Sequence, residues 1–439
     1  ANLNVTKSGD IINLGVFSVE FINSNHSIAD SMALAIRTPV GTILHTSDFK
    51  IDYTPVAGEP MNLQRIAEIG EEGIRLLMAD STNVEKEGFT ISERIVGESF
   101  EAIFAKASGR IIVATFASNV HRVQQVVNAA IKFNKKIIVF GRSMHNVMKK
   151  SIELGYLTVP PGTLIEPEEM DGYSPDKLVF IATGSQGEPM SALRRMAMET
   201  HRKAEISKGD LVIISASAIP GNEKPINKLI NGILKKGGDV IYEALHEIHS
   251  SGHACREELK LIHSLTKPDL FMPIHGEFRH LKRHSDLAKS IGMADKDIFI
   301  MENGKVLEID EYSAAIKGTV PSGYLMVDGL GVGDVGNIVL RDRKHLSQDG
   351  LITIVVTIEK STGEIIAGPD VITRGFVYVK ESELLINTIR EKTSEALYGL
   401  DLAAMDYNAI KNVIRKKLRE FLYKETKRNP MILPIIMEI

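Results

Sequence analysis

The chain has 439 residues, of which 44% are hydrophobic and 25% charged, as in ordinary globular proteins, and at roughly 150 residues per domain the length predicts about three domains. The net charge of −4 excludes a strongly basic, histone-like binder but is compatible with a local basic groove. The single cysteine, Cys255, excludes a disulfide framework and a cysteine-rich zinc module, and no run approaches 18 apolar residues, so we expect no membrane-spanning segment and no membrane partner.

The first part of the chain, residues 1–83, is rich in short strands. Its apolar stretches alternate with polar residues and are separated by turns, with one helix expected near 62–70. Dense strands with few helices are typical of one half of a sheet sandwich. The expected strands are 15–22, 31–38, 41–48 and 74–80.

From about residue 90, strands alternate with helices such as 121–133. These strands are continuous apolar runs, which indicates a parallel sheet covered on both faces. The sequence therefore predicts a doubly wound α/β domain. Its expected strands are 110–116, 135–140, 177–183, 210–217 and 239–245.

After residue 253 the pattern is more mixed. A helix (254–265), a strand (269–274) and a second helix (277–291) precede short strands around 297–309 and near 324–327. A glycine-rich connector then leads to a small α+β domain. Its expected elements are strands 350–360, 364–368, 375–379 and 431–439, and helices near 381–398 and 406–424.

The connector contains Gly331-x-Gly333-x-x-Gly336, formally a dinucleotide-binding motif. That motif requires a helix to begin there, so that the helix N-terminus faces the pyrophosphate. The next residues, "NIVLRDR", predict a strand or turn instead. We therefore expect a flexible connector and no nucleotide cofactor.

Five histidines and aspartates lie in polar turns: His26, Asp48, Asp80, His253 and His275. Three of them directly follow apolar strands, so their side chains are expected to gather at one sheet edge. Histidine and aspartate together suit zinc or manganese, with a carboxylate able to bridge two ions. Each alone has a structural alternative; Asp80, for example, could cap the next segment.

The carboxyl ends of the α/β strands carry four loops rich in Gly, Ser, Asn and Arg: 117–122, 141–144, 184–189 and 220–223. Backbone N–H groups, hydroxyls and a guanidinium at helix starts suit a phosphate. The alternative is that these residues are ordinary helix caps and turns; four such loops in register favour an anion site. The basic cluster Lys424, Lys427 and Arg428 is expected to be a solvated helix end, with RNA contact as the alternative.

At these residues the chain resembles the ribonuclease J family of metallo-β-lactamase/β-CASP nucleases, over essentially its whole length. The resemblance rests on many motifs in the family's order: "NHSIADS", "HTSDFKID", "ADSTN", "ATFASNVHR", "FGRSM", "GSQGEPMSAL", "SSGHA", "PIHGE", "GPDVITRGFVY" and "KRNPMILPIIME". It implies a partial metallo-β-lactamase αββα sandwich with an inserted doubly wound β-CASP domain and a small α+β C-terminal domain. The implied boundaries are 1–88 and 253–328 for the sandwich, 89–252 for the β-CASP domain, 329–350 for a linker and 351–439 for the last domain.

The resemblance also implies an activity: zinc-dependent hydrolysis of RNA, as a 5′-to-3′ exonuclease preferring 5′-monophosphate ends and as an endonuclease. The family acts in the cytoplasm, in mRNA decay and rRNA maturation. It implies two zinc ions per complete site, with Mn²⁺ or Mg²⁺ as alternatives, single-stranded RNA as substrate, and a homodimer, a tetramer or a hetero-oligomer with a paralogue.

The family pattern assigns roles to residues of this chain. His26, Asp48 and His275 resemble metal ligands, and Asp80 and His253 resemble a proton-transfer pair serving the leaving 3′-oxygen. His249, Ser250, Ser251, Gly252 and His253 resemble a substrate-binding loop. The residues expected to line the RNA channel and its 5′-phosphate pocket are Ser118, Asn119, His121, Arg142, Ser143, Gly184 and Ser185.

One family motif, His-x-His-x-Asp-His, does not occur: none of the 13 histidines has that spacing. The chain is therefore expected to lack the family's N-terminal part, to have an incomplete metal site and to be a poor nuclease alone. A second hypothesis is a non-catalytic RNA-binding or assembly subunit, which pairs with a complete paralogue through residues 350–439. The presence of Asp80, His253 and His275 argues against it, and the long α/β insertion disfavours a small-molecule metallohydrolase.

Overall fold

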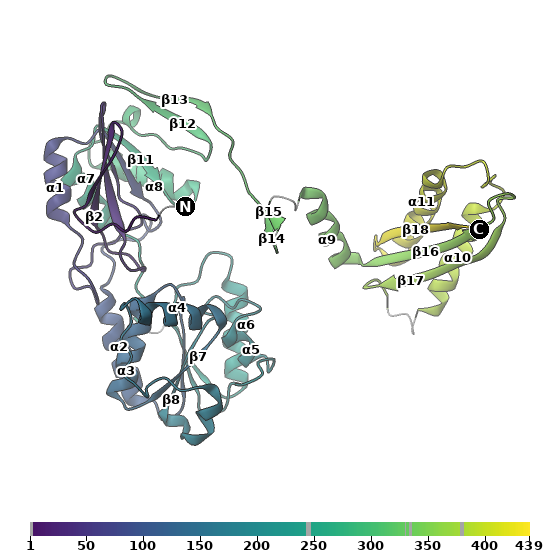
Figure 1. Ribbon diagram of the computed structural model, residues 1–439, viewed down its shortest axis with the longest axis horizontal. Helices are drawn as coiled ribbons and strands as arrows, with labels where there is room; N and C mark the ends of the chain where they lie inside the picture. Colours follow the sequence, from purple (N-terminus) through teal and green to yellow (C-terminus); the bar gives the residue numbers. More distant parts are fainter. Residues whose placement is uncertain (1–2, 243–246, 330, 333–335, 378–381) are drawn as a thin grey trace. The chain divides into compact units, whose positions relative to one another are not determined.

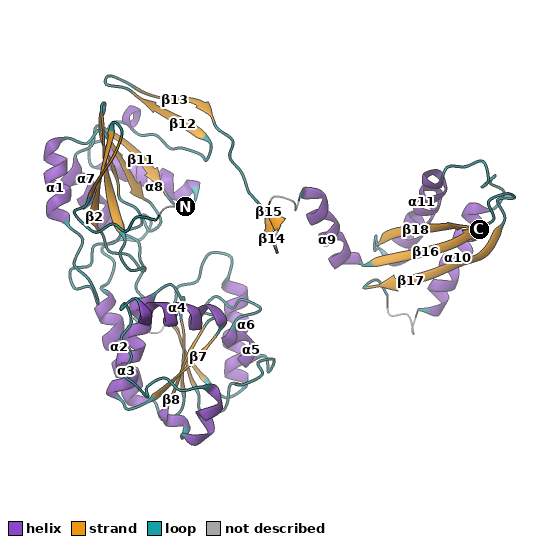
Figure 2. Cartoon of the chain, in the orientation of Figure 1, coloured by secondary structure: helices purple, strands orange, loops and turns teal. Residues whose placement is uncertain are grey.

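The computed structural model describes residues 3–242, 247–329, 331–332, 336–377 and 382–439. Contacts within the chain divide it into two compact units, Ala1–Pro321 and Ser322–Ile439, each considered separately below (Figures 1 and 2). None of the described helices is long and apolar enough to cross a membrane.

The first sheet of unit 1 has the strand order β1-β2-β3-β4-β5-β11. Strands β1 to β4 pair antiparallel, whereas β4 with β5 and β5 with β11 pair parallel. The last residues of β5 and β11, Asp80 and Ile274, are direct partners in the register. This pairing brings the chain segments after two distant strands to the same edge. The strands are β1 (Ile11–Leu14), β2 (Phe17–Asn23), β3 (Met32–Thr38), β4 (Gly41–His45), β5 (Leu76–Asp80) and β11 (Leu270–Ile274).

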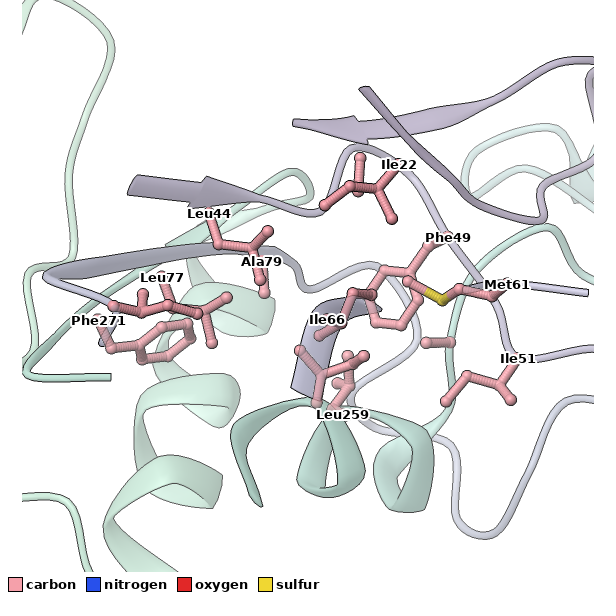
Figure 3. Packing of buried hydrophobic residues seen from close by; sticks show 14 of the residues in the cluster. Ile22, Leu44, Phe49, Ile51, Met61, Ile66, Leu77, Ala79, Leu259 and Phe271 are labelled. Atoms are coloured by element: carbon pink, nitrogen blue, oxygen red, sulfur yellow. The ribbon is translucent and has the colours of Figure 1, made fainter. Parts of the chain in front are cut away.

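Three helices pack their apolar sides against this sheet: α1 (Leu63–Glu72), α7 (Arg256–Thr266) and α8 (Phe278–Ser290). Figure 3 shows Leu77 beside Phe271 in the sheet and Ile66 beside Leu259 in the helices; all four belong to one apolar cluster and are almost fully buried. A Cβ on Gly70 would lie 2.1 Å from the carbonyl oxygen of Leu265, so only glycine allows α1 and α7 to approach this closely. A hairpin of β12 (Lys305–Ile309) and β13 (Ala314–Thr319) ends the unit; β13 lies where the sequence predicted no strand.

A buried histidine pair lies in this core. His263 Nε2 is 3.4 Å from His284 Nε2, and His284 Nδ1 is 3.0 Å from the hydroxyl of Ser81. Burial lowers the pKa of His263 to about 4. Burial also lowers the pKa of His284, and the neighbouring His263 adds to the effect. Both imidazoles are therefore neutral in the folded protein near pH 7.

We expect this pair to make unit 1 acid-sensitive. Between pH 6.5 and pH 4 the unfolded chain protonates His263 but the folded chain does not, so the free energy of unfolding falls as pH falls. With a folded pKa of about 4 against an ordinary 6.5, the loss through His263 alone is about 3 kcal/mol. Thermal unfolding of wild type and His263→Leu over pH 7 to 4 checks this. The variant should lose less stability across the window, whereas exposed His145→Gln should behave as wild type.

The second sheet has the order β10-β9-β6-β8-β7 with all neighbours parallel, and both faces are covered by helices and apolar clusters. The predicted doubly wound domain is thus confirmed. Its strands are β6 (Ile111–Ala114), β7 (Lys136–Phe140), β8 (Leu178–Ala182), β9 (Leu211–Ile214) and β10 (Asp239–Tyr242). Its helices are α2 (Glu93–Lys106), α3 (Val120–Lys132), α4 (Arg142–Glu153), α5 (Ala192–Ala197) and α6 (Glu223–Lys235).

Unit 2 is a small α+β domain, as predicted. Its sheet has the order β17-β16-β18, with β16 antiparallel to β17 and parallel to β18. Helices α10 and α11 bury their apolar residues against the buried side chains of β16. The elements are β14 (Val327–Asp328), β15 (Gly331–Val332), α9 (Asn337–Asp349), β16 (Leu351–Ile358), β17 (Ile365–Arg374), α10 (Glu383–Leu397), α11 (Tyr407–Thr426) and β18 (Met431–Glu438).

Two predictions in this unit are wrong. The segment "NIVLRDR" begins helix α9 rather than a strand or turn, because good helix formers follow its β-branched Ile338–Val339 pair. The segment before it is a two-residue strand in an antiparallel pair, which is not the parallel unit that a dinucleotide site requires; Gly333 lies outside the described residues. The strand predicted at 364–368 is the start of the longer strand β17, which runs to Arg374 and tolerates Pro369 because it is an edge strand. Of the strand predicted at 375–379, residues 375–377 form no strand and 378–379 lie outside the described residues.

Candidate active site

Five side chains meet at the carboxyl edge of the first sheet: His26, Asp48, Asp80, His253 and His275. One potential ligand atom from each of Asp48, Asp80, His253 and His275 lies within 4.8 Å of the others. The rings of His26 and His253 are in edge contact with centroids 4.9 Å apart, and those of His253 and His275 are stacked at 5.3 Å. The sheet order explains the meeting, since β2, β4, β5 and β11 all end at or near these residues.

The backbone is strained at one of these residues and next to another. His275 has φ 59° and Ser47, which precedes Asp48, has φ 55°. Non-glycine residues rarely adopt this left-handed conformation, which costs on the order of 1–3 kcal/mol and persists where the surrounding structure enforces it. Here the reversals after β4 and β11 turn Asp48 and His275 back over the end of β5.

The Asp80 carboxylate is the hydrogen-bond centre of the site. Its Oδ2 accepts from His253 Nδ1 at 2.7 Å, and its Oδ1 accepts from Thr82 N at 2.9 Å and from His275 Nδ1 at 3.3 Å. Burial alone would raise the pKa of Asp80, but the hydrogen bonds from His253 and His275 outweigh it and hold the pKa well below its usual range. Asp80 is therefore ionised, and His253 must donate its Nδ1 proton to it.

Thr82 belongs to the same centre, although the sequence analysis assigned it no role. Its hydroxyl lies 2.7 Å from Asp80 Oδ1 and 2.5 Å from His275 Nδ1, so it ties the two residues together. Asp80 raises the pKa of His275 through their hydrogen bond, against the effect of burial. The only sequence signal for Thr82 is its position two residues after the buried strand β5.

His26 lies outside the four-residue group above but faces Asp48, and both side chains could hold a metal ion. His26 Nδ1 donates to the carbonyl oxygen of Gly252 at 2.7 Å, which leaves the Nε2 lone pair available, as metal-binding histidines commonly do. Burial lowers the pKa of His26, which favours the neutral form that binds metals. Asp48 oxygens lie 3.8 Å from His26 Nε2 and 3.9 Å from His275 Nδ1. These separations exceed a hydrogen bond but suit donors gathered around one ion, so the residues present fit a divalent metal. To bind an ion through Nδ1, His275 would give up the proton that it donates to Asp80, as metal ligands commonly do.

The segment 249–253 is tied to the site along its length. Ser250 Oγ donates to Ile91 O at 2.7 Å, and Ser251 Oγ accepts from Asn83 Nδ2 at 2.7 Å. At Gly252 a Cβ would lie 2.5 Å from His26 Nδ1 and 2.9 Å from the Ser27 nitrogen. Only glycine therefore lets the Gly252 carbonyl reach His26.

A cavity of about 530 Å³ opens beside the pair Asp80–His253 and is lined from both sheets' loops. Burial, with nearby Arg122, Lys86 and Lys50, lowers the pKa of one lining residue, His249, to about 3, so its imidazole is neutral. Basic side chains Lys86 and Arg279 also face the cavity. The expected substrate-binding residues that line it are Ser118, Asn119, His249, Ser251, Gly252 and His253.

The other expected substrate residues lie elsewhere. His121 lines a separate cavity of about 150 Å³ together with His26. Arg142 and Ser143 are exposed at the start of α4, while Gly184 and Ser185 are buried after β8. Asn119 has a structural role as well, since its side chain accepts from Arg122 N at 3.0 Å and caps α3.

Comparison with known proteins covers most of the chain. Residues 108–233 match the family described as ribonuclease J, beta-CASP domain, and residues 338–439 match the ribonuclease J C-terminal domain. Residues 238–301, which include the segment 249–253 and His275, match the Zn-dependent metallo-hydrolase RNA specificity domain.

Relatives that match almost the whole of this chain agree with the family models. The chain is 47% identical over 424 residues to ribonuclease J 1 of Streptococcus pyogenes serotype M3, which covers 96% of this chain and 75% of that protein. The chain belongs to the ribonuclease J family. The chain is also 41% identical to ribonuclease J of Thermus thermophilus, over 100% of this chain and 75% of the relative, and 40% identical to ribonuclease J2 of Bacillus subtilis, over 100% of this chain and 79% of the relative. The family assignment confirms the resemblance of the motifs and the predicted fold class.

Proposed function

We propose that this chain is a metal-dependent ribonuclease that hydrolyses phosphodiester bonds in RNA, and that it does so slowly when alone, because none of its 13 histidines belongs to a His-x-His-x-Asp-His motif. The observation that carries the proposal is the hydrogen-bonded pair Asp80–His253, set beside the metal-ligand geometry of His26, Asp48 and His275 and opening on a cavity with basic side chains. Family membership supports the same reaction.

The residues divide into two groups in this proposal. His26, Asp48 and His275 hold the metal, which we take to be zinc, two ions per complete site, with Mn²⁺ or Mg²⁺ as alternatives. When bound, the metal supplies an activated hydroxide and neutralises charge on the scissile phosphate. Asp80 has both carboxylate oxygens engaged by histidine and threonine donors, which favours a hydrogen-bonding role for it over direct coordination.

His253 then moves the proton. Its Nδ1–H is held by Asp80, which fixes the tautomer and orientation of the ring. Its Nε2 is left to protonate the leaving 3′-oxygen. His249, Ser251 and Gly252, which line the cavity with His253, would contact the RNA around the cleaved bond.

We propose single-stranded RNA with a 5′-monophosphate as the preferred substrate, degraded 5′-to-3′ and also cut internally. The four loops at the carboxyl ends of the second sheet support this, since parallel strands direct them to one side. By family analogy, we propose that the protein acts in mRNA decay and rRNA maturation in the cytoplasm. By the same analogy it forms a homodimer, a tetramer or a hetero-oligomer with a paralogue.

The domain boundaries given in the sequence analysis stay predictions.

The decisive experiment uses the purified chain, dialysed against Zn²⁺ or Mn²⁺, with RNA labelled at its 3′ end. Release of mononucleotides with progressive shortening of the labelled strand supports exonuclease action, and discrete internal fragments support endonuclease action. Binding of RNA without hydrolysis under either metal would contradict the proposal and favour the alternative of a non-catalytic subunit.

Replacing Arg142 with alanine tests the 5′-phosphate pocket. Because a guanidinium at a helix start pairs well with a monophosphate, we expect the ratio of kcat/KM for 5′-phosphate over 5′-hydroxyl RNA to fall by about 10-fold, equivalent to about 1.4 kcal/mol. Exposed Arg94→Ala in the same domain is the matched control and should leave the ratio unchanged. An unchanged ratio in the Arg142 variant would place the pocket elsewhere.

A further inference from the structure

A buried ion network lies where the chain passes between the two sheets of unit 1. Lys50 and Asp52 follow β4, Glu93 begins α2 and Arg122 lies in α3. All four residues are buried: the exposed fractions are 1% for Lys50, 3% for Asp52, 5% for Glu93 and 0% for Arg122. Two positive and two negative charges balance, which is the condition under which charges tolerate burial.

The contacts within the network are short and directional. Arg122 Nη2 donates to Glu93 Oε1 at 2.9 Å and Arg122 Nε donates to Glu93 Oε2 at 3.2 Å, a two-pronged pair. Lys50 Nζ lies 3.3 Å from Asp52 Oδ2 and 3.9 Å from Glu93 Oε1. Asp52 Oδ2 also accepts from Glu93 N at 3.0 Å. Residues from both domains thus share one hydrogen-bonded centre.

Both cations also hold the segment that returns from the second domain. Arg122 Nη1 donates to Ile248 O at 3.3 Å, and Lys50 Nζ donates to Ser250 Oγ at 2.9 Å. Ser215 supplies a second donor to Ile248 O at 2.6 Å. The segment is further anchored at its ends, since Ile248 packs in the core of the second sheet and Ala254 in that of the first.

This segment carries two groups of the candidate site. Gly252 O accepts from His26 and His253 donates to Asp80, so a shift of the segment moves both contacts together. Stability alone does not account for such a network, because well-packed apolar residues often replace buried ion pairs without loss. Defined placement of the backbone is what the fixed fork of an arginine offers and an apolar side chain does not.

We propose that Arg122 and Lys50 are positioning residues, which set His253 against Asp80 and Gly252 against His26 through the 248–254 segment. The inference rests on the proposed ribonuclease function. Neither cation contacts Asp80 or His253 directly; they act by fixing the Ile248 carbonyl and the Ser250 hydroxyl. A misplacement of about 1 Å in such a segment can cost on the order of 100-fold in rate.

Arg122→Lys tests this, because lysine keeps the charge but cannot reach Glu93, Ser215 and Ile248 together. Arg110→Lys is the matched control: Arg110 forms a buried two-pronged pair with Asp210 in the same domain, away from this segment. We expect kcat for RNA hydrolysis to fall 10- to 100-fold in Arg122→Lys, with KM within about twofold, and both to stay near wild type in Arg110→Lys.

Amide hydrogen exchange of the metal-free protein tests the placement of the 248–254 segment without an activity measurement. In Arg122→Lys the peptide covering 248–255 should exchange about 10-fold faster than in wild type, with peptides of β6 and β8 unchanged. Equal exchange in both variants, or equal losses of kcat in both, would overturn the proposal. If wild type hydrolyses no RNA, the ribonuclease proposal fails while the exchange comparison still decides the positioning role. If Arg122→Lys does not fold, Ser215→Ala, which removes the second donor to Ile248, replaces it in both measurements.

Discussion

Replacing Asp80 with asparagine is expected to lower kcat for RNA hydrolysis by about 10²- to 10⁴-fold, the range that general acid–base catalysis contributes. The carboxylate accepts from His253 Nδ1 at 2.7 Å, whereas an amide can present an N–H there and cannot balance a protonated imidazole. The ring of His253 then loses both its fixed tautomer and the charge that stabilises it. RNA affinity should change little, because Asp80 is 1% exposed.

Single-turnover hydrolysis and RNA binding, measured on wild type and Asp80→Asn, check this result. Asp210→Asn is the matched control, since Asp210 is a buried carboxylate paired with Arg110, and it should keep activity if it folds. Bound metal is measured in parallel, because Asp80 also lies in the group of potential ligands. Equal metal content with lost activity supports the proton-transfer role; lost metal makes Asp80 a ligand instead. Activity within threefold of wild type would contradict both.

Local sequence patterns predicted most of the fold because its strands are short apolar runs bounded by turns. The strands around 110–116 and 177–183 needed only hydrophobicity and length to be recognised, and the helices between them only the 3.6-residue period. The same reasoning failed for "NIVLRDR", where two β-branched residues outweighed the helix formers that follow. It also failed at β17, because a proline suggests a break unless the strand is known to be at an edge.

Residues of the candidate site that lie in a recognisable sequence motif could be predicted. Residues whose role depends only on tertiary contacts could not. Asp80 ends an apolar strand and His275 follows one, so their meeting needed only the assumption of adjacent parallel strands, which the register of β5 with β11 provides. No sequence pattern of this kind identifies Arg122 or Lys50. An arginine inside an amphipathic helix and a lysine after a strand usually face solvent. Arg122 and Lys50 are buried because they contact a segment of the same chain that is distant in sequence.

Replacing Asp48 with alanine is expected to weaken zinc binding by more than about 100-fold, since changing even the partners of metal ligands costs 10- to 100-fold. Asp48 is the carboxylate between His26 Nε2 and His275 Nδ1, at 3.8 and 3.9 Å, so its removal leaves two imidazoles without the anionic donor that brings them to one ion. Activity should fall in proportion at limiting zinc and recover in part at high zinc.

Competition with a coloured zinc chelator measures the affinity, and Asp30→Ala is the control. Asp30 is an exposed carboxylate of the segment after His26 whose partner is the hydroxyl of Tyr156, so its loss removes the same charge nearby without removing a donor from the cluster. Equal affinities for wild type and Asp48→Ala would show that the metal is held by other residues. Equal weakening of zinc binding in both variants would show an effect of general negative charge. Salt would screen such an effect, so the difference from wild type should then disappear at high salt. A loss confined to Asp48→Ala and insensitive to salt is what direct coordination requires.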